Sequence, residues 1–270
     1  METGPTTAPA IRGPAAVACE LLDNGFVHLR ERHAGRRAAW TRAGEVFAAA
    51  AAHDAIGAGL PELEVVGEFT VPPLGALRRD FQPLHIDFGL PIGGSQAADV
   101  ARFTALYIDR DHPATAAWTR VVPLRALLGR REWRDDVTLL ERLRRYVASE
   151  AGSARAEGIL GRLVEAADDT RALPSTADPE FLCGMEFASL SEERAHFAKH
   201  LLDLDAVERR VLLGPGELLV VDNLATAHGR VGVRRPEELH QLCAGYRQLD
   251  VDRQQVLLRR VLGAFRPART

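Results

Sequence analysis

The stretch "GELLVVDNLATAHGR" (Gly216–Arg230) joins an apolar run to a compact group of polar residues. The run Glu217–Val221 predicts a buried strand, because it is short and rich in branched side chains. It ends at Asp222-Asn223, and His228 follows shortly afterwards, directly before Gly229-Arg230. Taken alone, such a histidine also fits a buried imidazole bonded to Asp222. A functional role needs a second group of candidate ligands elsewhere in the chain.

That second group lies in "FQPLHIDFGLPI" (Phe81–Ile92), which places His85 and Asp87 inside an apolar stretch. In an extended chain, residues two apart point to the same side. If that side faces a core, both groups lose their water, which is costly unless a partner charge or a metal ion compensates. On its own the pair is better explained as an exposed ion pair at a strand end, because such pairs are common.

Together, these two motifs, H-x-D and D-N-x4-H-G-R, resemble the Fe(II)- and 2-oxoglutarate-dependent oxygenases of the taurine dioxygenase superfamily. The similarity is greatest to the branch of γ-butyrobetaine and trimethyllysine hydroxylases. The stretch "HQLCAGYRQLDVD" (His240–Asp252) resembles the last strand of that family, and "LLDNGFVHLR" (Leu21–Arg30) resembles its first. The resemblance covers most of the chain and is weakest over residues 130–200.

The resemblance implies that His85, Asp87 and His228 are catalytic residues that bind one iron ion. Two imidazoles and one carboxylate on one face of an octahedral metal suit Fe(II), and the other face stays open for a co-substrate and O2. The implied fold is α+β: a double-stranded β-helix (a jelly-roll barrel) with flanking and inserted helices. The mouth of such a barrel can hold a metal and a small ligand.

The resemblance also implies a binding site for 2-oxoglutarate. It places Thr119 beside a carboxylate of this co-substrate, although a threonine is equally an ordinary strand residue. We expect Arg230, next to His228, to belong to the same site. Asp222 is expected to position Arg230 or His228 without itself binding the metal, or else to cap a turn.

One position on the expected last strand departs from the family pattern. The family holds the distal carboxylate with an arginine, whose planar fork makes two charge-assisted bonds, whereas this chain has His240 there. Protonated His240 could take this role, or Arg247, Arg235 or Arg120 could reach in from elsewhere. In the remaining alternative, the enzyme uses no 2-oxoglutarate and takes electrons from its substrate.

The rest of the chain predicts one domain. Residues 1–16 are expected to be a flexible tail, and residues 17–270 a single oxygenase domain with a helical insert at about 132–200. Ser191 is the expected N-cap of a helix near the end of that insert. The other expected elements are a helix and a strand within 17–30, a helix at 38–57, and strands at 101–111 and 238–251.

Composition narrows the function. The chain is 46% hydrophobic and 26% charged with a net charge of −3, which is typical of a soluble globular protein and gives no sign of nucleic-acid or membrane partners. Three widely spaced cysteines argue against a disulfide framework and favour the cytoplasm. The sequence leaves open whether the protein forms a homo-oligomer.

The expected reaction is hydroxylation or desaturation of a small molecule with O2. Aromatic residues are sparse, at 6%, which argues against a cage for a quaternary ammonium. An amino acid or a natural-product intermediate is therefore expected, with Phe103, Tyr107 and residues 181–187 as candidate lining. Two alternatives remain: a zinc site at His196 and His200, which lacks the His-Glu-x-x-His signature, and a β-barrel binding protein without catalysis.

Overall fold

The computed structural model of the chain describes residues 12–55, 59–71, 80–85, 87, 97–109, 117–123, 189–199, 204–232, 239–250, 252–254 and 256–257. The helices are α1 (Pro14–Asn24), α2 (Arg36–Ala55), α8 (Leu190–Lys199) and α9 (Leu204–Val207). The strands are β1 (Phe26–Leu29), β2 (Glu64–Val71), β3 (Phe81–His85), β4 (Ala98–Ile108), β5 (Ala117–Pro123), β6 (Arg209–Val211), β7 (Leu218–Asp222), β8 (Thr226–Gly232) and β9 (Leu239–Leu249).

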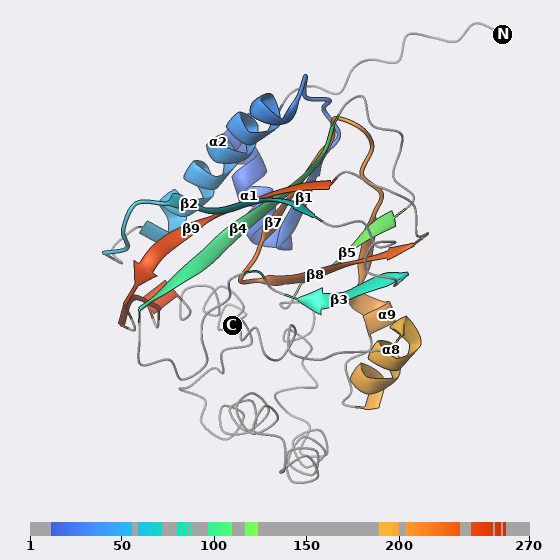
Figure 1. The fold of residues 1–270 in the computed structure, drawn as a ribbon. Helices are drawn as coiled ribbons and strands as arrows, with labels where there is room; N and C mark the ends of the chain where they lie inside the picture. The colour runs from blue at the N-terminus through green and yellow to red at the C-terminus, as the bar shows by residue number, and fades with distance from the viewer. Residues whose placement is uncertain are drawn as a thin grey trace, which may run out of the picture.

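Two antiparallel sheets form the centre of the molecule (Figure 1). The five-stranded sheet has the order β1-β7-β4-β9-β2, and the four-stranded sheet has the order β3-β8-β5-β6. Strands that follow one another in the chain mostly lie in different sheets, so the chain repeatedly crosses between the layers. The fold is therefore a mixture of α and β structure built on antiparallel sheets.

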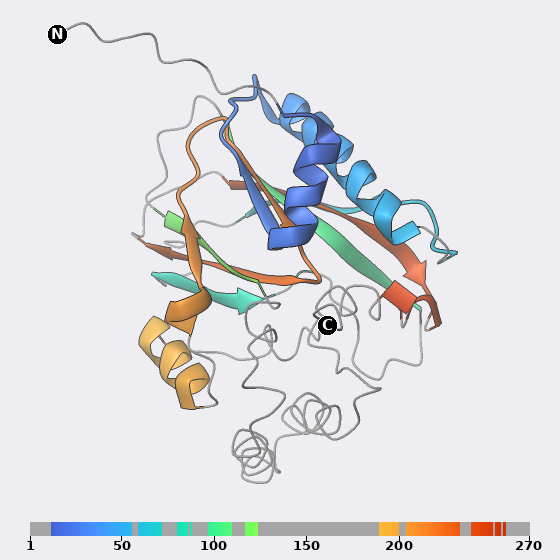
Figure 2. The ribbon, with the colours of Figure 1, turned by 180° about the vertical axis from the view of Figure 1, so that it is seen from behind.

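Helices α1 and α2 cover the outer face of the five-stranded sheet (Figure 2). Helix α1 begins at Pro14, inside the range expected to be a tail, and proline is favoured in a first helical turn. It ends at Gly25, whose φ of 81° suits a glycine and whose N–H bonds the carbonyl of Leu21. The α2 side chain Phe47 stacks on Phe103 of β4 at 5.5 Å. Within the described part of the chain, no helix is long and apolar enough to span a membrane.

A second apolar core fills the space between the sheets. It contains Leu106 and Val221 from the five-stranded sheet and Val121 from the four-stranded sheet, all buried. The five-stranded sheet is therefore apolar on both faces. This explains why its strands, such as β7, are continuously buried rather than alternating with solvent.

Alternation along β4 and β9 decides which side chains face the second sheet. Leu242 and Ala244 of β9 pack with the helices, as do Phe103 and Tyr107 of β4. The candidate lining residues Phe103 and Tyr107 thus lie under α1 and α2 rather than between the sheets. The prediction that they share a face was right, but a sequence pattern does not say which of two buried faces is theirs.

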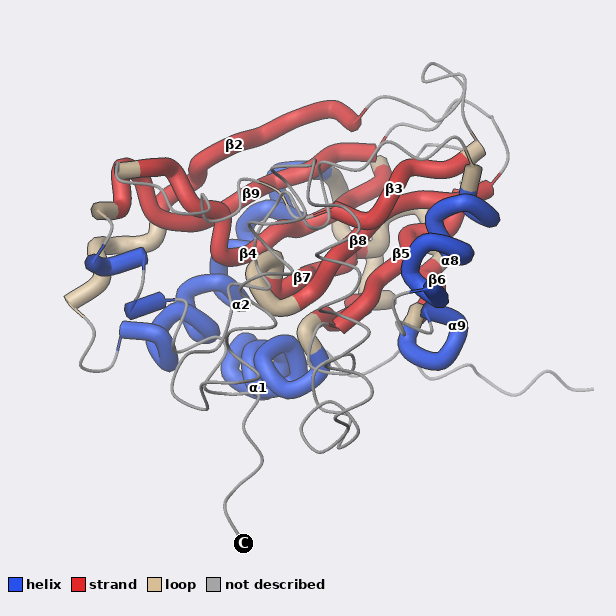
Figure 3. The backbone as a smooth tube through the Cα atoms, turned by 90° about the horizontal axis from the view of Figure 1, so that it is seen from below, coloured by secondary structure: helices blue, strands red, loops and turns tan. Residues whose placement is uncertain are grey.

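Helix α8 lies beside the four-stranded sheet, away from α1 and α2 (Figure 3). The hydroxyl of Ser189 accepts a hydrogen bond from the Glu192 N–H at 3.1 Å, so Ser189 caps this helix and the expected cap at Ser191 was wrong. Buried Glu193 accepts a hydrogen bond from the Leu84 N–H at 2.8 Å. A side chain thereby satisfies a backbone donor of β3, which is one of the two edge strands of its sheet.

Candidate metal centre

His85, Asp87 and His228 meet at one end of the four-stranded sheet. Their potential ligand atoms all lie within 4.8 Å of one another. Oδ2 of Asp87 is 3.0 Å from Nε2 of His228, and Oδ1 is 3.6 Å from Nε2 of His85. The two imidazole rings are 4.5 Å apart between centroids. The three side chains that the two motifs predicted are thus brought together.

Strand pairing produces this meeting. His85 of β3 and His228 of β8 are directly opposite each other in the antiparallel register, after an irregularity between Gln82 and His85. A Cβ at position 229 would lie 2.6 Å from the Gln82 carbonyl oxygen, too close for any side chain. The glycine of H-G-R therefore allows β8 to approach β3 closely enough to pair the two histidines.

The protonation of His85 suits a metal ligand. Its Nδ1 lies 2.9 Å from the carbonyl oxygen of Pro83 and donates to it, which leaves the lone pair of Nε2 toward the cluster. Burial, together with the positive charge of nearby His228, lowers the pKa of His85 to about 4. The ring is therefore neutral near pH 7.

Asp87 has the opposite character. Burial by itself would raise the pKa of this carboxyl, but the nearby charge of His228, whose Nε2 lies 3.0 Å from Oδ2, lowers the pKa to about 2. Asp87 is thus ionised at any physiological pH. A neutral imidazole beside a carboxylate is the state in which these groups bind a cation.

The surroundings fit a metal as well. Both ring nitrogens of His228 are buried, and neither makes a well-formed hydrogen bond within the described part of the chain. Leaving such atoms unsatisfied is costly, and a cation bound at Nε2 would remove part of that cost. The donor set of two imidazole nitrogens and one carboxylate oxygen, on one side of the centre, matches Fe(II).

Three residues that the motifs did not single out as ligands hold Asp87 in place. Gln241 Nε2 and Thr104 Oγ1 donate to Oδ2, at 2.5 and 3.2 Å. Asn223 bonds the backbone on both sides: its Oδ1 accepts from the Asp87 N–H at 2.9 Å, and its Nδ2 donates to the Asp87 carbonyl at 2.6 Å. Asn223 belongs to the D-N-x4-H-G-R motif and Gln241 to the stretch His240–Asp252, but the contact of neither residue with Asp87 was predicted.

Cys243 lies next to this group without joining it. Burial, reinforced by the charge of Asp87, raises the pKa of the Cys243 thiol to about 12. The thiol stays protonated, and a thiol is a poor metal ligand compared with a thiolate. Among the described residues, the centre therefore has only nitrogen and oxygen donors.

Thr119 and Arg230 lie on the same face as the centre. In the pairing of β5 with β8, Thr119 is opposite Arg230 and Val121 is opposite His228. Since residues two apart share a face, Arg230 and His228 project together. The Arg230 side chain is buried, with 3% of the residue exposed, and its Nε donates to Gln82 Oε1 at 2.9 Å.

His240 lies on the wrong side of the sheet for the predicted role. Its Nε2 is 3.0 Å from Asp109 Oδ2, and its ring stacks on Tyr107 on the face that α2 covers. Its neighbour Gln241 is the residue that points toward Asp87. The expected interaction of His240 with a keto acid therefore does not fit its position, because one residue along a strand is the difference between opposite faces.

The other candidate cations are also engaged elsewhere. Arg247 is half-exposed and contacts Asp99 at 3.3 Å and the Val65 carbonyl at 2.7 Å, so the expectation that it binds co-substrate does not fit its position. Arg120 is buried against Glu208 at 2.7 Å, on the opposite face of β5 from Thr119. Arg235 lies outside the described residues.

Asp222 differs from its expected role as well. It forms a buried ion pair with Arg102 of β4, and alternation along β7 places it with Leu218 and Val220 on the helix-covered face. His200 and residues 181–187 lie outside the described residues, as does most of the expected insert at 132–200, and the side chain of His196 does too.

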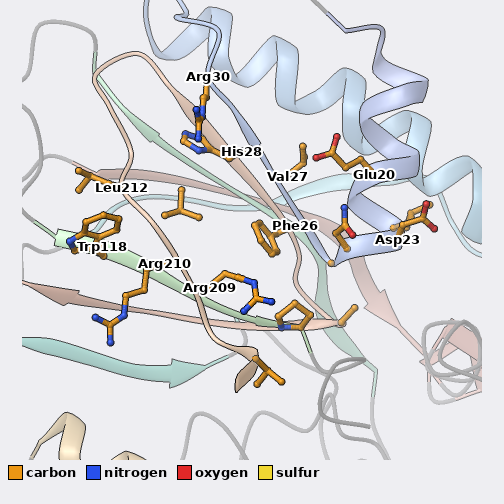
Figure 4. Close-up of a pocket in the computed structure, with 17 residues that line it drawn as sticks. Glu20, Asp23, Phe26, Val27, His28, Arg30, Trp118, Arg209, Arg210 and Leu212 are labelled. Atoms are coloured by element: carbon orange, nitrogen blue, oxygen red, sulfur yellow. The ribbon is translucent and has the colours of Figure 1, made fainter. Parts of the chain in front are cut away.

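A separate cavity of about 1000 Å³ opens between the edge strands β1 and β6 (Figure 4). Phe26, Trp118 and Arg209 line it. Among the described residues that line this cavity, none belongs to the predicted site. It is distinct from the metal centre, which lies where β3, β8 and β9 come together.

Comparisons with known proteins identify no family. No protein-family model matches the chain, and no curated protein matches its sequence. Among solved structures, PvcB from Pseudomonas aeruginosa is 14% identical with a TM-score of 0.49, over 89% of this chain and 86% of that one. A second PvcB structure, described as an Fe, alpha-ketoglutarate dependent oxygenase from an isonitrile synthetic pathway, is 16% identical with the same TM-score and coverage.

An asparagine oxygenase in complex with Fe(II), 3-hydroxyasparagine and succinate is 15% identical, with a TM-score of 0.40, over 88% of this chain and 80% of that one. All these TM-scores are below 0.5, so any function for this chain has to rest on its own residues.

Proposed function

We propose that this protein is a non-haem Fe(II)-dependent oxygenase that uses 2-oxoglutarate and O2 to hydroxylate or desaturate a small molecule. The observation that carries the proposal is the convergence of His85, Asp87 and His228, with their ligand atoms within 4.8 Å. An ionised carboxylate and two imidazoles on one side of a cation are the ligand set of Fe(II) oxygenases.

The fold proposal goes with it. We infer a double-stranded β-helix, supported by the way strands β2 to β5 and β7 to β9 alternate between two antiparallel sheets. Membership of the taurine dioxygenase superfamily, and of its branch of γ-butyrobetaine and trimethyllysine hydroxylases, is proposed on the H-x-D and D-N-x4-H-G-R motifs. The boundaries of one domain at 17–270 stay a prediction.

The protein residues prepare the site for the cation. Fe(II), when bound, supplies the redox chemistry and the open coordination positions that side chains lack. Asp87 contributes the negative charge, and Pro83 fixes the tautomer of His85 so that Nε2 faces the centre. Burial of His228 keeps water from competing for its ring nitrogens.

We propose that Arg230 and Thr119, rather than His240, bind the carboxylate of the co-substrate. Both are buried, they are opposite each other across β5 and β8, and Arg230 is on the face of His228. A guanidinium can make two charge-assisted bonds to a carboxylate, and a threonine hydroxyl can add a third. Arg230 thus supplies the charge that the family places on its last strand.

The overall reaction balances with these parts. Reduction of O2 takes four electrons: two come from the oxidation of 2-oxoglutarate to succinate and CO2, and two from the substrate C–H bond. The substrate is proposed to be an amino acid or a natural-product intermediate. A cytoplasmic location and the lack of nucleic-acid or membrane partners stay predictions.

The test is anaerobic reconstitution of the protein with Fe(II), followed by addition of O2, 2-oxoglutarate and a panel of free amino acids. We expect one iron per chain and succinate formed in step with O2 uptake. Iron binding with no succinate, but with O2 uptake driven by a substrate alone, would support the substrate-electron alternative. A chain that binds no iron would refute the proposal.

A further inference from the structure

The carboxylate of Asp87 is held unequally at its two oxygens. Oδ2 accepts hydrogen bonds from Gln241 Nε2 and Thr104 Oγ1, and it also lies 3.0 Å from Nε2 of His228. Oδ1 has no hydrogen-bond donor within the described residues, and His85 Nε2 is 3.6 Å away from it. A carboxylate oxygen has about two lone-pair sites, so the two donors occupy Oδ2 and leave the lone pairs of Oδ1 available.

We propose that Gln241 and Thr104 are positioning residues, which hold Oδ2 and turn Oδ1 toward the metal so that Asp87 binds through one oxygen. This inference rests on the proposed function. A carboxylate that bound through both oxygens would occupy an additional position on an octahedral ion. Single-oxygen binding keeps that position free for the co-substrates.

The chemistry of the two donors supports this role. Both are neutral, so they fix the carboxylate without offsetting the negative charge that attracts a divalent cation. A lysine or arginine in the place of Gln241 would compete with the metal for Asp87. The adjacent Cys243, whose Sγ lies 3.4 Å from Gln241 Nε2, is likewise neutral.

The backbone arrangement aims these donors at Asp87. Thr104 of β4 and Cys243 of β9 are paired across the sheet, and Gln241 lies two residues before Cys243 on the same face. Asn223 separately holds the Asp87 backbone through two hydrogen bonds. Backbone and side chain of Asp87 are thus fixed by different residues, and the side-chain contacts can be removed alone.

The experiment compares Gln241→Leu, Thr104→Val and Thr104→Ser with wild type, using Co(II) and Fe(II) added anaerobically to metal-free protein. Dissociation constants are measured by titration, and the Co(II) absorption spectrum reports the coordination. His240→Gln is the matched control, because this residue is on the same strand with its side chain on the opposite face.

We expect Gln241→Leu and Thr104→Val to weaken metal binding about 10- to 100-fold, as loss of a residue that orients a ligand commonly does. Both should also change the Co(II) spectrum. Thr104→Ser keeps the hydroxyl and should restore affinity and spectrum, while His240→Gln should match wild type. If Thr104→Val and Gln241→Leu keep the wild-type affinity and spectrum, the inference is wrong.

Two further outcomes are distinguishable. If wild-type protein binds neither metal, the proposed function fails together with the inference. If wild type binds iron and forms succinate while the variants behave identically, only the inference fails. Should Gln241→Leu not fold, the nearly isosteric pair Thr104→Val and Thr104→Ser still decides the matter, with melting of the metal-free protein as the check on folding.

Discussion

The two faces of the five-stranded sheet use polar groups in different ways. On the helix-covered face, polar residues satisfy one another: Asp222 pairs with Arg102, and His240 contacts Asp109. On the face toward the second sheet, Thr104 and Gln241 both donate to the single carboxylate of Asp87. Polar residues that pair with each other stabilise the fold. Donors that converge on one carboxylate beside two imidazoles instead hold that carboxylate ready to bind a ligand.

The strongest test of this comparison is Asp87→Asn. The substitution keeps the shape and removes the charge, so we expect stoichiometric Fe(II) binding and succinate formation to be lost. The free energy of unfolding of the metal-free protein should fall modestly, because the lowered pKa of Asp87 means that His228 stabilises its ionised form in the folded state. Metal analysis and urea unfolding measure the two effects. Retained iron with turnover would contradict the assignment of Asp87.

Asp222→Asn should show the reverse behaviour. Breaking a buried ion pair leaves Arg102 as an uncompensated charge and costs about 3–5 kcal/mol of stability. The fraction that stays folded should bind Fe(II) as tightly as wild type, since Asp222 lies on the far face. Chemical unfolding and metal titration check both parts. A large loss of metal affinity in folded protein would mean that the two faces are coupled.

Arg230→Gln tests the smaller region around the co-substrate. Loss of a hydrogen-bonding cation should weaken 2-oxoglutarate binding to the iron-loaded protein by about 1.5–3 kcal/mol, while iron affinity stays close to wild type. His240→Gln, which changes the other face, should leave both affinities unchanged. Equilibrium binding under anaerobic conditions gives the numbers. If His240→Gln weakened 2-oxoglutarate binding and Arg230→Gln did not, then His240 rather than Arg230 would bind the co-substrate carboxylate.

The smallest expected effect is on the pH dependence of stability in metal-free protein. The pKa of His85 is about 4 in the folded state, against an ordinary value of 6.5 for histidine. Between these values the unfolded chain takes up a proton that the folded chain does not, so stability falls as pH drops from about 6.5 to about 4. The slope from this group is at most about 1.4 kcal/mol per pH unit.

His85→Gln should flatten that slope without abolishing it. His33, whose pKa burial also lowers, contributes in the same direction and stays in the variant. The measurement is the urea unfolding free energy at several pH values between 7 and 4 for both proteins. Identical slopes would show that His85 is not buried as a neutral ring.

The three candidate ligands were predictable from the two sequence motifs, which contain His85, Asp87 and His228. The expectation that one strand carries both His85 and Asp87 was wrong, because β3 ends at His85 and Asp87 lies in a turn. The residues that surround these ligands were harder to predict, because their contacts depend on which of two buried faces of the sheet each side chain occupies. His240 and Gln241 differ by one position, and the pairing of β4 with β9 contains register shifts that no sequence pattern shows.

The same limit explains other differences. Phe103 and Tyr107 alternate as a strand should, yet both faces of their sheet are apolar, so their side could not be chosen in advance. Ser189 and Ser191 are equally good helix caps by residue type, and only the structure shows that Ser189 bonds the Glu192 N–H. Long-range partners such as Arg102 and Asp222 follow from tertiary packing alone.

The hydrogen bond from Leu84 N–H to Glu193 bears on how the protein is made. The two residues are 109 positions apart in the chain. During synthesis His85 and Asp87 leave the ribosome long before Glu193, which holds the strand that carries His85, and longer still before His228. A nascent chain therefore presents only an incomplete pair of ligands. Under the proposed function, all three ligands would be available to iron only after His228 has been synthesised and β8 has paired with β3.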